Sequence, residues 1–547
     1  MIKKLAILLL ISCIILSCNN ARKTESIKQE KTDTVQKQKK ITARDYSIDK
    51  ANSYSDIFFD SLKLETFILD KKVPDTLSRR MRSFYNARNY QFAWFSSTGL
   101  AEQALAFWNL HNYDFYEGDT TIKDKVLQKK MDDLMTDTAL SVNANDKSML
   151  STELALTEHF IRFSLNNYDK EYLKRKEMER FVPLKKVDPI ALADSLLNKK
   201  HKNNKYFDDI NEAYKKLKEQ LNLYVEIEKK GGWQTFTGDV KKIKKGSQLA
   251  AVTLLKKRLA ITGDLTGSDT TQIFNDTLAI AIRHAQQRFG YTPTGILTST
   301  LIKDLNVSVT KRIEQLLINL NRMRFMPAEP DGKLILVNIP EFQLHFFDKK
   351  NKVFDMNVVV GKEGHNTMMF TGKLSTVVFS PYWNVPSSIV KKELLPKMAK
   401  NPNYLASQQM EVTGNEGGLP VVRQKPGEKN SLGKVKFLFP NSFNIYFHDT
   451  PAKSLFSQDV RAYSHGCVRL SDPLKMAETL LKDNSQWPDD KIVEAMNSGN
   501  EQFVKIKDPV PVFITYYTAW VDESGLLNFR QDIYKKDAAV ASKMFLK

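Results

Sequence analysis

Apolar side chains recur at helical spacing through the first half of the chain. Between residues 46 and 240 they stand three and four positions apart, with charged residues between them. The clearest stripe has lysines on its opposite face and ends before Gly231-Gly232, which suits a helix C-terminus. Its members are Ile210, Tyr214, Leu217, Leu221 and Tyr224. Residues 100–110 and 154–165 repeat the pattern, so we predict a helical scaffold domain over residues 46–240 with an aromatic core.

A second, smaller helical unit spans residues 245–305. It contains two apolar stripes at helical spacing, separated by a turn-rich stretch and followed by a glycine turn at residues 290–295. The stripes consist of Leu249, Val252, Leu255 and Leu259, then Leu278, Ala281, Ile282, Ala285 and Phe289. We predict two or three short helices in this unit, and one further amphipathic helix over residues 311–325.

From Lys333 onward the pattern changes to short β-branched and aromatic runs bounded by Gly, Pro, Asn or Asp. The runs cover residues 334–339, 342–347, 353–360, 377–379, 435–439, 444–447, 511–517 and 526–529. Because several of them follow one another without helices, they predict an antiparallel sandwich or a partly closed barrel. We place this mostly-β domain at residues 332–482, with a C-terminal extension over residues 483–547 that completes it. The predicted class of the whole chain is therefore α+β and multidomain.

The strand pattern breaks between Tyr382 and Gly433. Residues 390–399 predict a helix, and a polar, glycine-containing stretch follows over residues 401–430. Insertions of this length are typical of functional lids. We therefore predict a helical and loop-like lid at about residues 385–432.

The N-terminus has the pattern of an export signal over residues 1–18. Two lysines precede an apolar run that is too short to span a bilayer, which takes about 20 residues. The run ends at Ser17-Cys18 and resembles a bacterial lipobox, which would make Cys18 the lipidated first residue of the mature protein. Cys13 fits this role less well, and an ordinary cleaved signal or an uncleaved anchor is the alternative. Residues 19–45 are polar and lack aromatic residues, so we predict a flexible linker.

The net charge of +19 is spread along the chain. A diffuse basic bias favours acidic partners, such as lipid headgroups or carboxylate-bearing cell-wall polymers. No run of Arg and Lys alternates with aromatic residues, so the pattern does not favour nucleic acid as a partner.

Cys467 is the cysteine that is left for the body of the chain, since Cys13 and Cys18 belong to the export signal. Its thiolate would be the attacking species, and a thiol with the ordinary pKa of about 8.5 needs a base to form it. His448 ends a strand-like run upstream, and a returning segment can bring it against Cys467. The carbonyl or the carboxylate of Asp449 could then orient the imidazole.

The other neighbours of Cys467 also suit a nucleophile. Gly466 permits an unusual backbone conformation, and the amides of Gly466 and Cys467 could face a developing oxyanion. Arg469 is placed to hold a substrate carboxylate or to fix the loop. Two alternatives stay open: an inert buried thiol, and a zinc site whose ligands would be His448, His465, Cys467 and Asp449.

Two segments resemble the signature of L,D-transpeptidases with a YkuD-type catalytic domain. They are residues 447–456 (FHDTPAKSLF) and 461–470 (RAYSHGCVRL). The chain is similar above all to the large, YcbB-like members, which combine a helical scaffold, a peptidoglycan-binding domain and a catalytic domain with an inserted capping subdomain. Further agreement lies in residues 338–340, 358–362, 381–386, 430–433, 518–522 and 529–534. One departure is Thr367-Met368, where the family usually has Thr-Pro.

The resemblance implies a covalent mechanism that needs neither a metal nor an organic cofactor. Cys467 would attack the carbonyl of the third residue, usually diaminopimelate, of a tetrapeptide stem and release D-Ala. The side-chain amine of another stem would then take the acyl group and form a bond between third residues. His448 would act as base and acid, while His465 and the amides of Gly466 and Cys467 shape the oxyanion site. Carbapenems are the expected inhibitor class.

The resemblance also implies the surroundings of the reaction. Arg469, Tyr463 and Trp383 would line the cleft, and the insertion would close over it. The expected partners are peptidoglycan stem peptides and glycan, bound partly by residues 245–305, and a membrane through the lipid at Cys18. The expected location is the periplasm, with the outer membrane favoured over the inner. L,D-carboxypeptidase activity, attachment of a lipoprotein to peptidoglycan, and a non-catalytic wall-binding lipoprotein remain alternatives, and the oligomeric state stays open.

Overall fold

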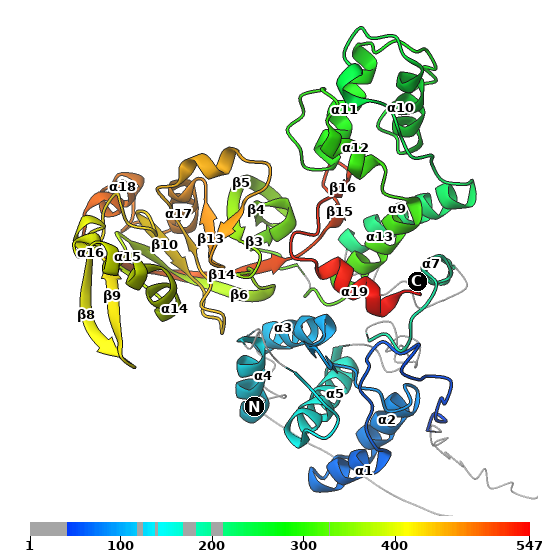
Figure 1. Cartoon of the computed structure of the whole chain (residues 1–547). Coiled ribbons are helices and arrows are strands. Elements are labelled where there is room, and N and C mark those ends of the chain that lie inside the picture. Colours follow the sequence, from blue (N-terminus) through cyan, green and yellow to red (C-terminus); the bar gives the residue numbers. More distant parts are fainter. Residues whose placement is uncertain are drawn as a thin grey trace, which may run out of the picture. The chain divides into compact units, whose positions relative to one another are not determined.

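The computed structural model describes residues 41–116, 124–136, 141–167, 182–198, 212–327 and 329–546 (Figure 1). The expected signal peptide and most of the expected linker lie outside these residues. Within the ranges given, no helix is both long and apolar enough to cross a membrane. The predicted fold class is confirmed, because a helical region, a small helical domain and a mostly-β domain follow one another along the chain.

Helices dominate the first region, as their apolar spacing predicts. They are α1 (Ser61–Asp70), α2 (Asp75–Asn86), α3 (Glu102–Tyr116), α4 (Lys125–Thr136), α5 (Lys147–Asn167), α7 (Pro189–Leu197) and α9 (Glu212–Lys229), with a small hairpin of β1 (Phe95–Ser96) and β2 (Gly99–Leu100). Trp94 and Trp108 are almost fully buried in one shared apolar core, which confirms the structural role expected for the aromatic residues. In α9, Tyr214, Leu217, Leu221 and Tyr224 are buried as predicted, whereas Ile210 lies outside the described residues.

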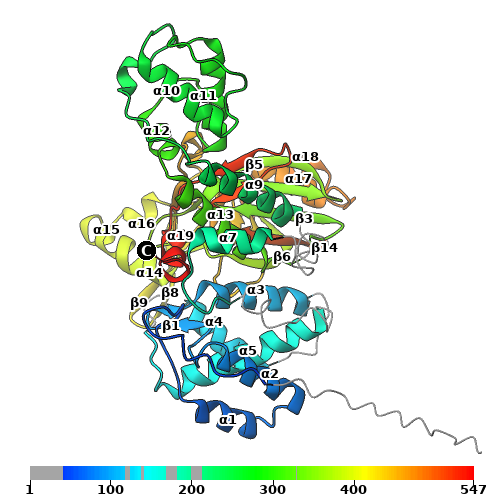
Figure 2. The same ribbon diagram turned by 90° about the vertical axis from the view of Figure 1, so that its right-hand side faces the viewer.

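The small helical domain consists of α10 (Ala250–Ile261), α11 (Asp276–Arg288) and α12 (Ser299–Leu305), which Figure 2 shows gathered together. It is followed by α13 (Val309–Met323). The side chains of Asn275, Thr298 and Ser308 accept hydrogen bonds from backbone amides in the first turns of α11, α12 and α13. Three helix starts are thus fixed locally by the sequence.

The β domain is built on a nine-stranded sheet with the order β12-β5-β13-β11-β10-β6-β14-β3-β4, and an additional pairing of β4 with β5 closes it into a ring. Its strands are β3 (Lys333–Asn338), β4 (Gln343–Asp348), β5 (Asn351–Gly361), β6 (Phe370–Phe379), β10 (Val435–Leu438), β11 (Phe447–His448), β12 (Ala462–Ser464), β13 (Val468–Leu470) and β14 (Gln502–Thr515). Alternate side chains of these strands point inward and form the buried core, together with α17 (Pro473–Leu481) and α18 (Asp489–Asn497).

The sheet differs from the expected antiparallel one in its strand directions. The pairs β11–β13, β12–β5 and β14–β3 are parallel. Parallel neighbours need a long crossover, and residues 449–467 supply one between β11 and β13. The C-terminal extension supplies β14, which lies between β6 and β3.

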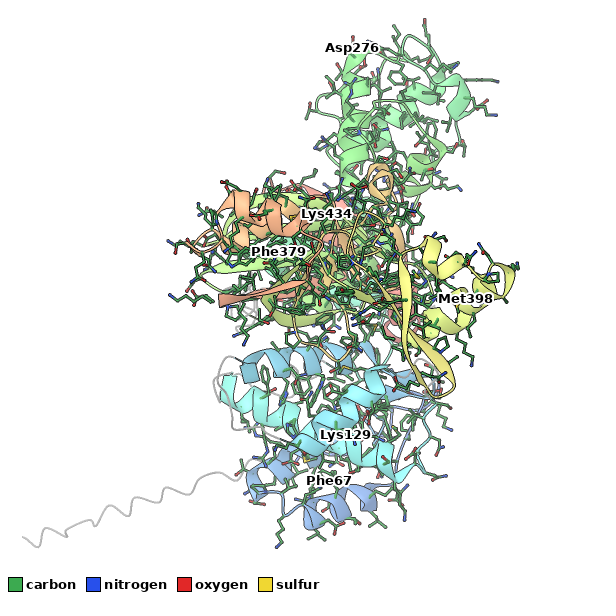
Figure 3. The ribbon with its side chains drawn as sticks, turned by 90° about the vertical axis from the view of Figure 1, so that its left-hand side faces the viewer. Phe67, Lys129, Asp276, Phe379, Met398 and Lys434 are labelled. Atoms are coloured by element: carbon green, nitrogen blue, oxygen red, sulfur yellow. The ribbon has the colours of Figure 1, made fainter. Side chains whose placement is uncertain are left out.

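The insertion forms a separate small unit that we call the cap, residues 383–424. It consists of β7 (Trp383–Asn384), α14 (Ser387–Ile389), a π-helical turn (Val390–Leu394), α15 (Leu395–Lys400), α16 (Tyr404–Ser407), β8 (Met410–Glu416) and β9 (Leu419–Gln424). It has its own apolar core around Val390, Leu394 and Val422. Figure 3 labels Met398 on this cap and Phe379 on β6 of the main sheet.

The three-stranded sheet β7-β9-β8 corrects the expectation of a purely helical and loop-like lid. The hairpin turns at Gly417 and Gly418, and most side chains of β8 are exposed. A strand with solvent on both faces needs no apolar alternation, and the pattern therefore did not reveal it. After β14, the chain adds the hairpin of β15 (Ala519–Val521) and β16 (Leu527–Phe529) and ends with α19 (Lys536–Met544).

Candidate active site

Strands β11 and β13 bring four polar side chains to one face of the sheet. The strands are parallel, with Phe447 beside Val468 and His448 beside Arg469. Phe447 and Val468 are fully buried in the core. Because neighbours along a strand point to opposite faces, the outer face carries Tyr446, His448, Cys467 and Arg469.

His448 is buried and its orientation is fixed by its own neighbour. Its Nδ1 lies 2.5 Å from the main-chain oxygen of Asp449. A carbonyl oxygen can only accept, so Nδ1 carries the hydrogen and Nε2 presents a lone pair. Burial lowers the pKa of His448 to about 3, helped by the positive charge of Arg469. The imidazole is therefore a neutral ring with Nε2 ready to accept a proton.

The sequence left open whether the carbonyl or the carboxylate of Asp449 would orient the imidazole. The carbonyl does so, because the carboxylate binds other groups. It accepts hydrogen bonds from the amides of Thr450 and Lys434 and pairs with Nζ of Lys453 at 2.7 Å. Asp449 therefore anchors the start of the crossover with its side chain and His448 with its backbone.

The Cys467 side chain is hydrogen-bonded to the Tyr446 hydroxyl. The Tyr446 hydroxyl and backbone hydrogen bonds favour the thiolate, but burial outweighs them and raises the pKa of the Cys467 thiol. Burial also raises the pKa of Tyr446 far above its ordinary value, and the thiolate beside it adds to this rise. The Sγ atom lies 3.7 Å from the main-chain oxygen of Asn444.

The thiol and the imidazole are not hydrogen-bonded to one another at rest. No hydrogen bond or ion pair within the described chain joins Cys467 to His448, although both lie on the same face of adjacent strands. The pKa of the thiol is raised and that of the imidazole is lowered. The resting pair is therefore neutral, and proton transfer must accompany the attack on a substrate.

The backbone amides of Gly466 and Cys467 differ in whether they are free to bind an oxyanion. Gly466 has φ of +119°, which favours glycine, and its N–H donates to Oγ of Ser464 at 3.1 Å. Ser464 Oγ in turn donates to the Cys467 carbonyl at 2.6 Å. The expectation that the Gly466 amide faces an oxyanion is therefore corrected, because this amide is already bound. The Cys467 N–H has no hydrogen-bond acceptor among the described residues and is the available donor.

His465 contacts the cap. Its Nε2 lies 2.7 Å from Oε1 of Glu393, and its ring packs edge-on against His365 with centroids 4.9 Å apart. Burial lowers the pKa of His365, and His465 lowers it further. Within the described chain His465 makes no hydrogen bond to Cys467. It therefore links the nucleophile loop to the insertion.

The three side chains expected to line the cleft lie in different surroundings. Nε of Arg469 is buried and has no hydrogen-bond partner in the described part of the chain, and burial lowers the pKa of Arg469. Tyr463 is 44% exposed, which leaves it free to contact a ligand. Trp383 is partly buried against the core of the cap.

The zinc alternative requires its four side chains to converge on one point. The Asp449 carboxylate instead binds Lys453 and two backbone amides, and Nε2 of His465 binds Glu393. Among the residues with described positions, no group of three or more His, Cys, Asp or Glu side chains is suited to hold a metal ion.

Sequence reasoning missed Tyr446 as a neighbour of the thiol. The signal was available, because Tyr446 precedes His448 by two positions in a strand-like run and such residues share a face. What the sequence did not give was the register that sets Phe447 beside Val468 and so brings Tyr446 to Cys467.

Comparisons with known proteins agree with these three regions. A family model of the "L,D-transpeptidase catalytic domain" matches residues 332–512. A "Scaffold domain" model matches residues 79–221, and a "Putative peptidoglycan binding domain" model matches residues 248–305.

A curated Haemophilus influenzae protein named "Putative L,D-transpeptidase" is 33% identical over 243 residues, which cover 42% of this chain and 49% of that protein. The chain thus spans about half the length of this relative. An L,D-transpeptidase structure from Mycobacterium smegmatis is 17% identical, covering 34% of this chain and 58% of that one, with a TM-score of 0.19. One from Stackebrandtia nassauensis is 15% identical, covering 51% and 95%, with a TM-score of 0.21.

The order of the three matched domains is that of the large transpeptidases, and the matched catalytic domain contains the face with Cys467 and His448. Residues 332–512 thus match the YkuD-type L,D-transpeptidase catalytic domain, and the three matches together support a large, YcbB-like L,D-transpeptidase.

Proposed function

We propose that this protein is an L,D-transpeptidase that joins the third residues of two peptidoglycan stem peptides through a thioester on Cys467. The observation that carries the proposal is the shared face of β11 and β13. It combines a thiol at Cys467, a neutral imidazole at His448 with its Nε2 lone pair available, and the unpaired Cys467 N–H.

In the proposed acylation step, Sγ of Cys467 bonds to the carbonyl carbon of the third stem residue. The thiol proton moves to Nε2 of His448 as the bond forms, because neither group is charged at rest. The carbonyl oxygen becomes an oxyanion that the Cys467 N–H stabilises. The bond to the terminal D-Ala nitrogen then breaks, and His448 returns the proton to that nitrogen. The products are a thioester and free D-Ala.

In the second step, the side-chain amine of another stem attacks the thioester carbonyl. His448 accepts a proton from the attacking nitrogen, and the C–S bond breaks. The sulfur leaves as a thiolate and regains its proton from His448, which restores the neutral resting pair. No cofactor takes part in either step.

We assign substrate contacts to the charged and exposed groups around this face. A stem peptide ends in a carboxylate, and the guanidinium of Arg469, a partly exposed residue beside His448 in the sheet, is suited to bind one. Tyr463 and Trp383 would contact the stem on either side. The cap, in contact with the nucleophile loop through Glu393 and His465, would shield the thioester from water and so favour the amine as acceptor.

The location proposed for this activity is the periplasm. Lipid attached to Cys18 would hold the protein on a membrane, the outer one in preference to the inner, and residues 19–45 would form the tether. The domain at residues 248–305 would bind peptidoglycan near the catalytic domain.

Purified tetrapeptide-stem muropeptides provide the test. After incubation with the protein, mass spectrometry should detect dimers that lack one D-Ala. Shortened monomers without dimers would instead assign an L,D-carboxypeptidase, and transfer to a protein lysine would assign attachment of a lipoprotein. Unchanged muropeptides would leave a wall-binding role and contradict the proposal. A carbapenem should acylate the same thiol.

A further inference from the structure

Thr367, which lies outside the signature motif, hydrogen-bonds to the peptide group that precedes Cys467. Thr367, which follows β5 by six residues, is fully buried. Its Oγ1 accepts a hydrogen bond from the Gly361 amide at 2.9 Å and donates one to the Gly466 carbonyl at 2.7 Å. One hydroxyl thus joins the end of β5 to the nucleophile loop.

The Gly466 carbonyl and the Cys467 N–H are the two ends of one planar, trans peptide unit. They point in opposite directions, so a bond that fixes the carbonyl also fixes the direction of the N–H. Gly466 has a positive φ, and glycine restricts the rotation of its neighbouring peptide groups least. The orientation of this peptide group therefore depends on a hydrogen bond from another residue. We infer that Thr367 is a positioning residue for the reaction, which aims the Cys467 N–H at the oxyanion by holding the Gly466 carbonyl.

A second residue, from the C-terminal region, holds Thr367 in place. The Tyr534 hydroxyl donates to the Gly361 carbonyl at 2.5 Å and accepts from the Thr367 amide at 3.3 Å. Burial raises the pKa of Tyr534 to about 12, so the hydroxyl keeps its proton and remains a donor. Its ring stacks on Tyr516 with centroids 5.5 Å apart, and its amide donates to the Tyr516 hydroxyl.

The backbone around Gly361 is packed so closely that it leaves no space for a side chain there. A Cβ atom at Gly361 would lie 2.0 Å from the His365 carbonyl and 2.8 Å from the Thr367 nitrogen. The chain therefore turns back on itself between Gly361 and Thr367. This turn places the Thr367 hydroxyl within hydrogen-bond distance of the Gly466 carbonyl. A C-terminal segment that supplies no reacting group thereby sets the geometry of the oxyanion site.

The inference rests on the proposed function, because an oxyanion must form for the amide to matter. Loss of a single oxyanion donor costs about 100- to 1,000-fold in rate. A misdirected donor should cost less, so we expect Thr367→Val to slow acylation about 10- to 100-fold. Thr367→Ser retains the hydroxyl and should restore most of the rate. Tyr534→Phe should have a smaller effect than Thr367→Val, because the Thr367 hydroxyl remains.

The experiment uses the full protein and two reactions of the same thiol. Carbapenem acylation, followed by intact mass, passes through an oxyanion. Alkylation by iodoacetamide displaces iodide and forms none. Thr515→Val is the matched control, because Thr515 is also buried and its hydroxyl also donates to a backbone carbonyl, that of Val337. Circular dichroism melts of all variants report on folding.

The inference predicts that Thr367→Val slows acylation while the alkylation rate stays within about threefold of wild type. Thr515→Val should change neither rate by that much. Equal acylation of Thr367→Val and wild type would overturn the inference and leave the proposed function intact. A parallel loss of both rates would overturn it too, since it would indicate a disordered loop. If the wild type itself were not acylated, the proposed function would fall and the inference with it.

Discussion

Nδ1 of His448 lies 2.5 Å from the main-chain oxygen of Asp449, the residue that follows it. This contact fixes the tautomer through a neutral carbonyl rather than through a carboxylate. Burial lowers the pKa of this imidazole to about 3 in spite of the contact, and burial also raises the pKa of the nearby thiol. In the proposed mechanism, such a site acts by general-base catalysis rather than through a preformed thiolate–imidazolium pair.

The backbone contact predicts a mild effect of Asp449→Asn. Where a carboxylate itself orients the histidine, this change costs about 10,000-fold in rate. Here the carbonyl remains, so acylation should slow by less than about tenfold. The free energy of unfolding should fall by about 1–3 kcal/mol, because the amide group cannot replace both accepting oxygens. Carbapenem acylation rates and denaturant unfolding measure the two effects, and a loss of catalysis without a loss of stability would contradict the assignment.

The hydrogen bond from Tyr446 to the thiolate makes Tyr446→Phe a test of nucleophile activation. Without the hydroxyl the pKa of Cys467 should rise further, and alkylation by iodoacetamide at neutral pH should slow about tenfold. Tyr463→Phe is the control for alkylation, because the Tyr463 hydroxyl makes no hydrogen bond to Cys467 within the described residues. Equal alkylation rates in Tyr446→Phe and wild type would show that the hydroxyl does not support the thiolate.

The lowered pKa of His448 predicts an unusual pH profile. A group with a pKa of about 3 is deprotonated at all higher pH values, so the base is available throughout. The second-order rate of acylation should therefore lack an acidic limb between about pH 5 and pH 8, where an ordinary histidine titrates. Activity should fall only as the pH approaches 3. A midpoint near 6.5 in the rate profile would contradict a neutral, buried imidazole.

The contact between Glu393 and His465 predicts a role for the cap in the choice of acceptor. Both side chains are partly exposed, so Glu393→Gln should leave the stability unchanged. If the contact keeps the cap closed, the variant should release a few-fold more shortened monomer per dimer in the muropeptide assay. Glu411→Gln is the control, because it changes another carboxylate of the cap, one that pairs with Arg423 and Lys425. It should leave the product ratio unchanged. An identical product ratio in wild type and Glu393→Gln would exclude the contact from this role.

Local signals in the sequence were enough to predict most of the fold. The stripe in α9 and the β-branched runs of β3 to β5 lie where their spacing predicts, because most of their apolar side chains are buried. Strand β8 was not predictable in this way, since most of its side chains are exposed. The position of β14 between β6 and β3 depends on long-range pairing that periodicity does not encode.

The candidate site likewise contains residues that could be predicted from the sequence and residues that could not. Cys467, His448 and Asp449 could be predicted because they stand in short segments with recognisable chemistry. Thr367 could not, because its partner Gly466 is 99 positions away and only the folded chain joins them. The actual bond of the Gly466 amide, to Ser464, also depends on a backbone conformation that the sequence merely permits.

The thioester on Cys467 is tested most directly by trapping it. The protein is mixed with a tetrapeptide-stem donor whose side-chain amine is acetylated, so that no acceptor amine is present, then quenched in acid and digested for peptide mapping by mass spectrometry. The account predicts an adduct of the stem minus D-Ala on the peptide that contains Cys467, and none in Cys467→Ala. An adduct on another residue, or the same cross-linked products from Cys467→Ala as from wild type, would contradict it.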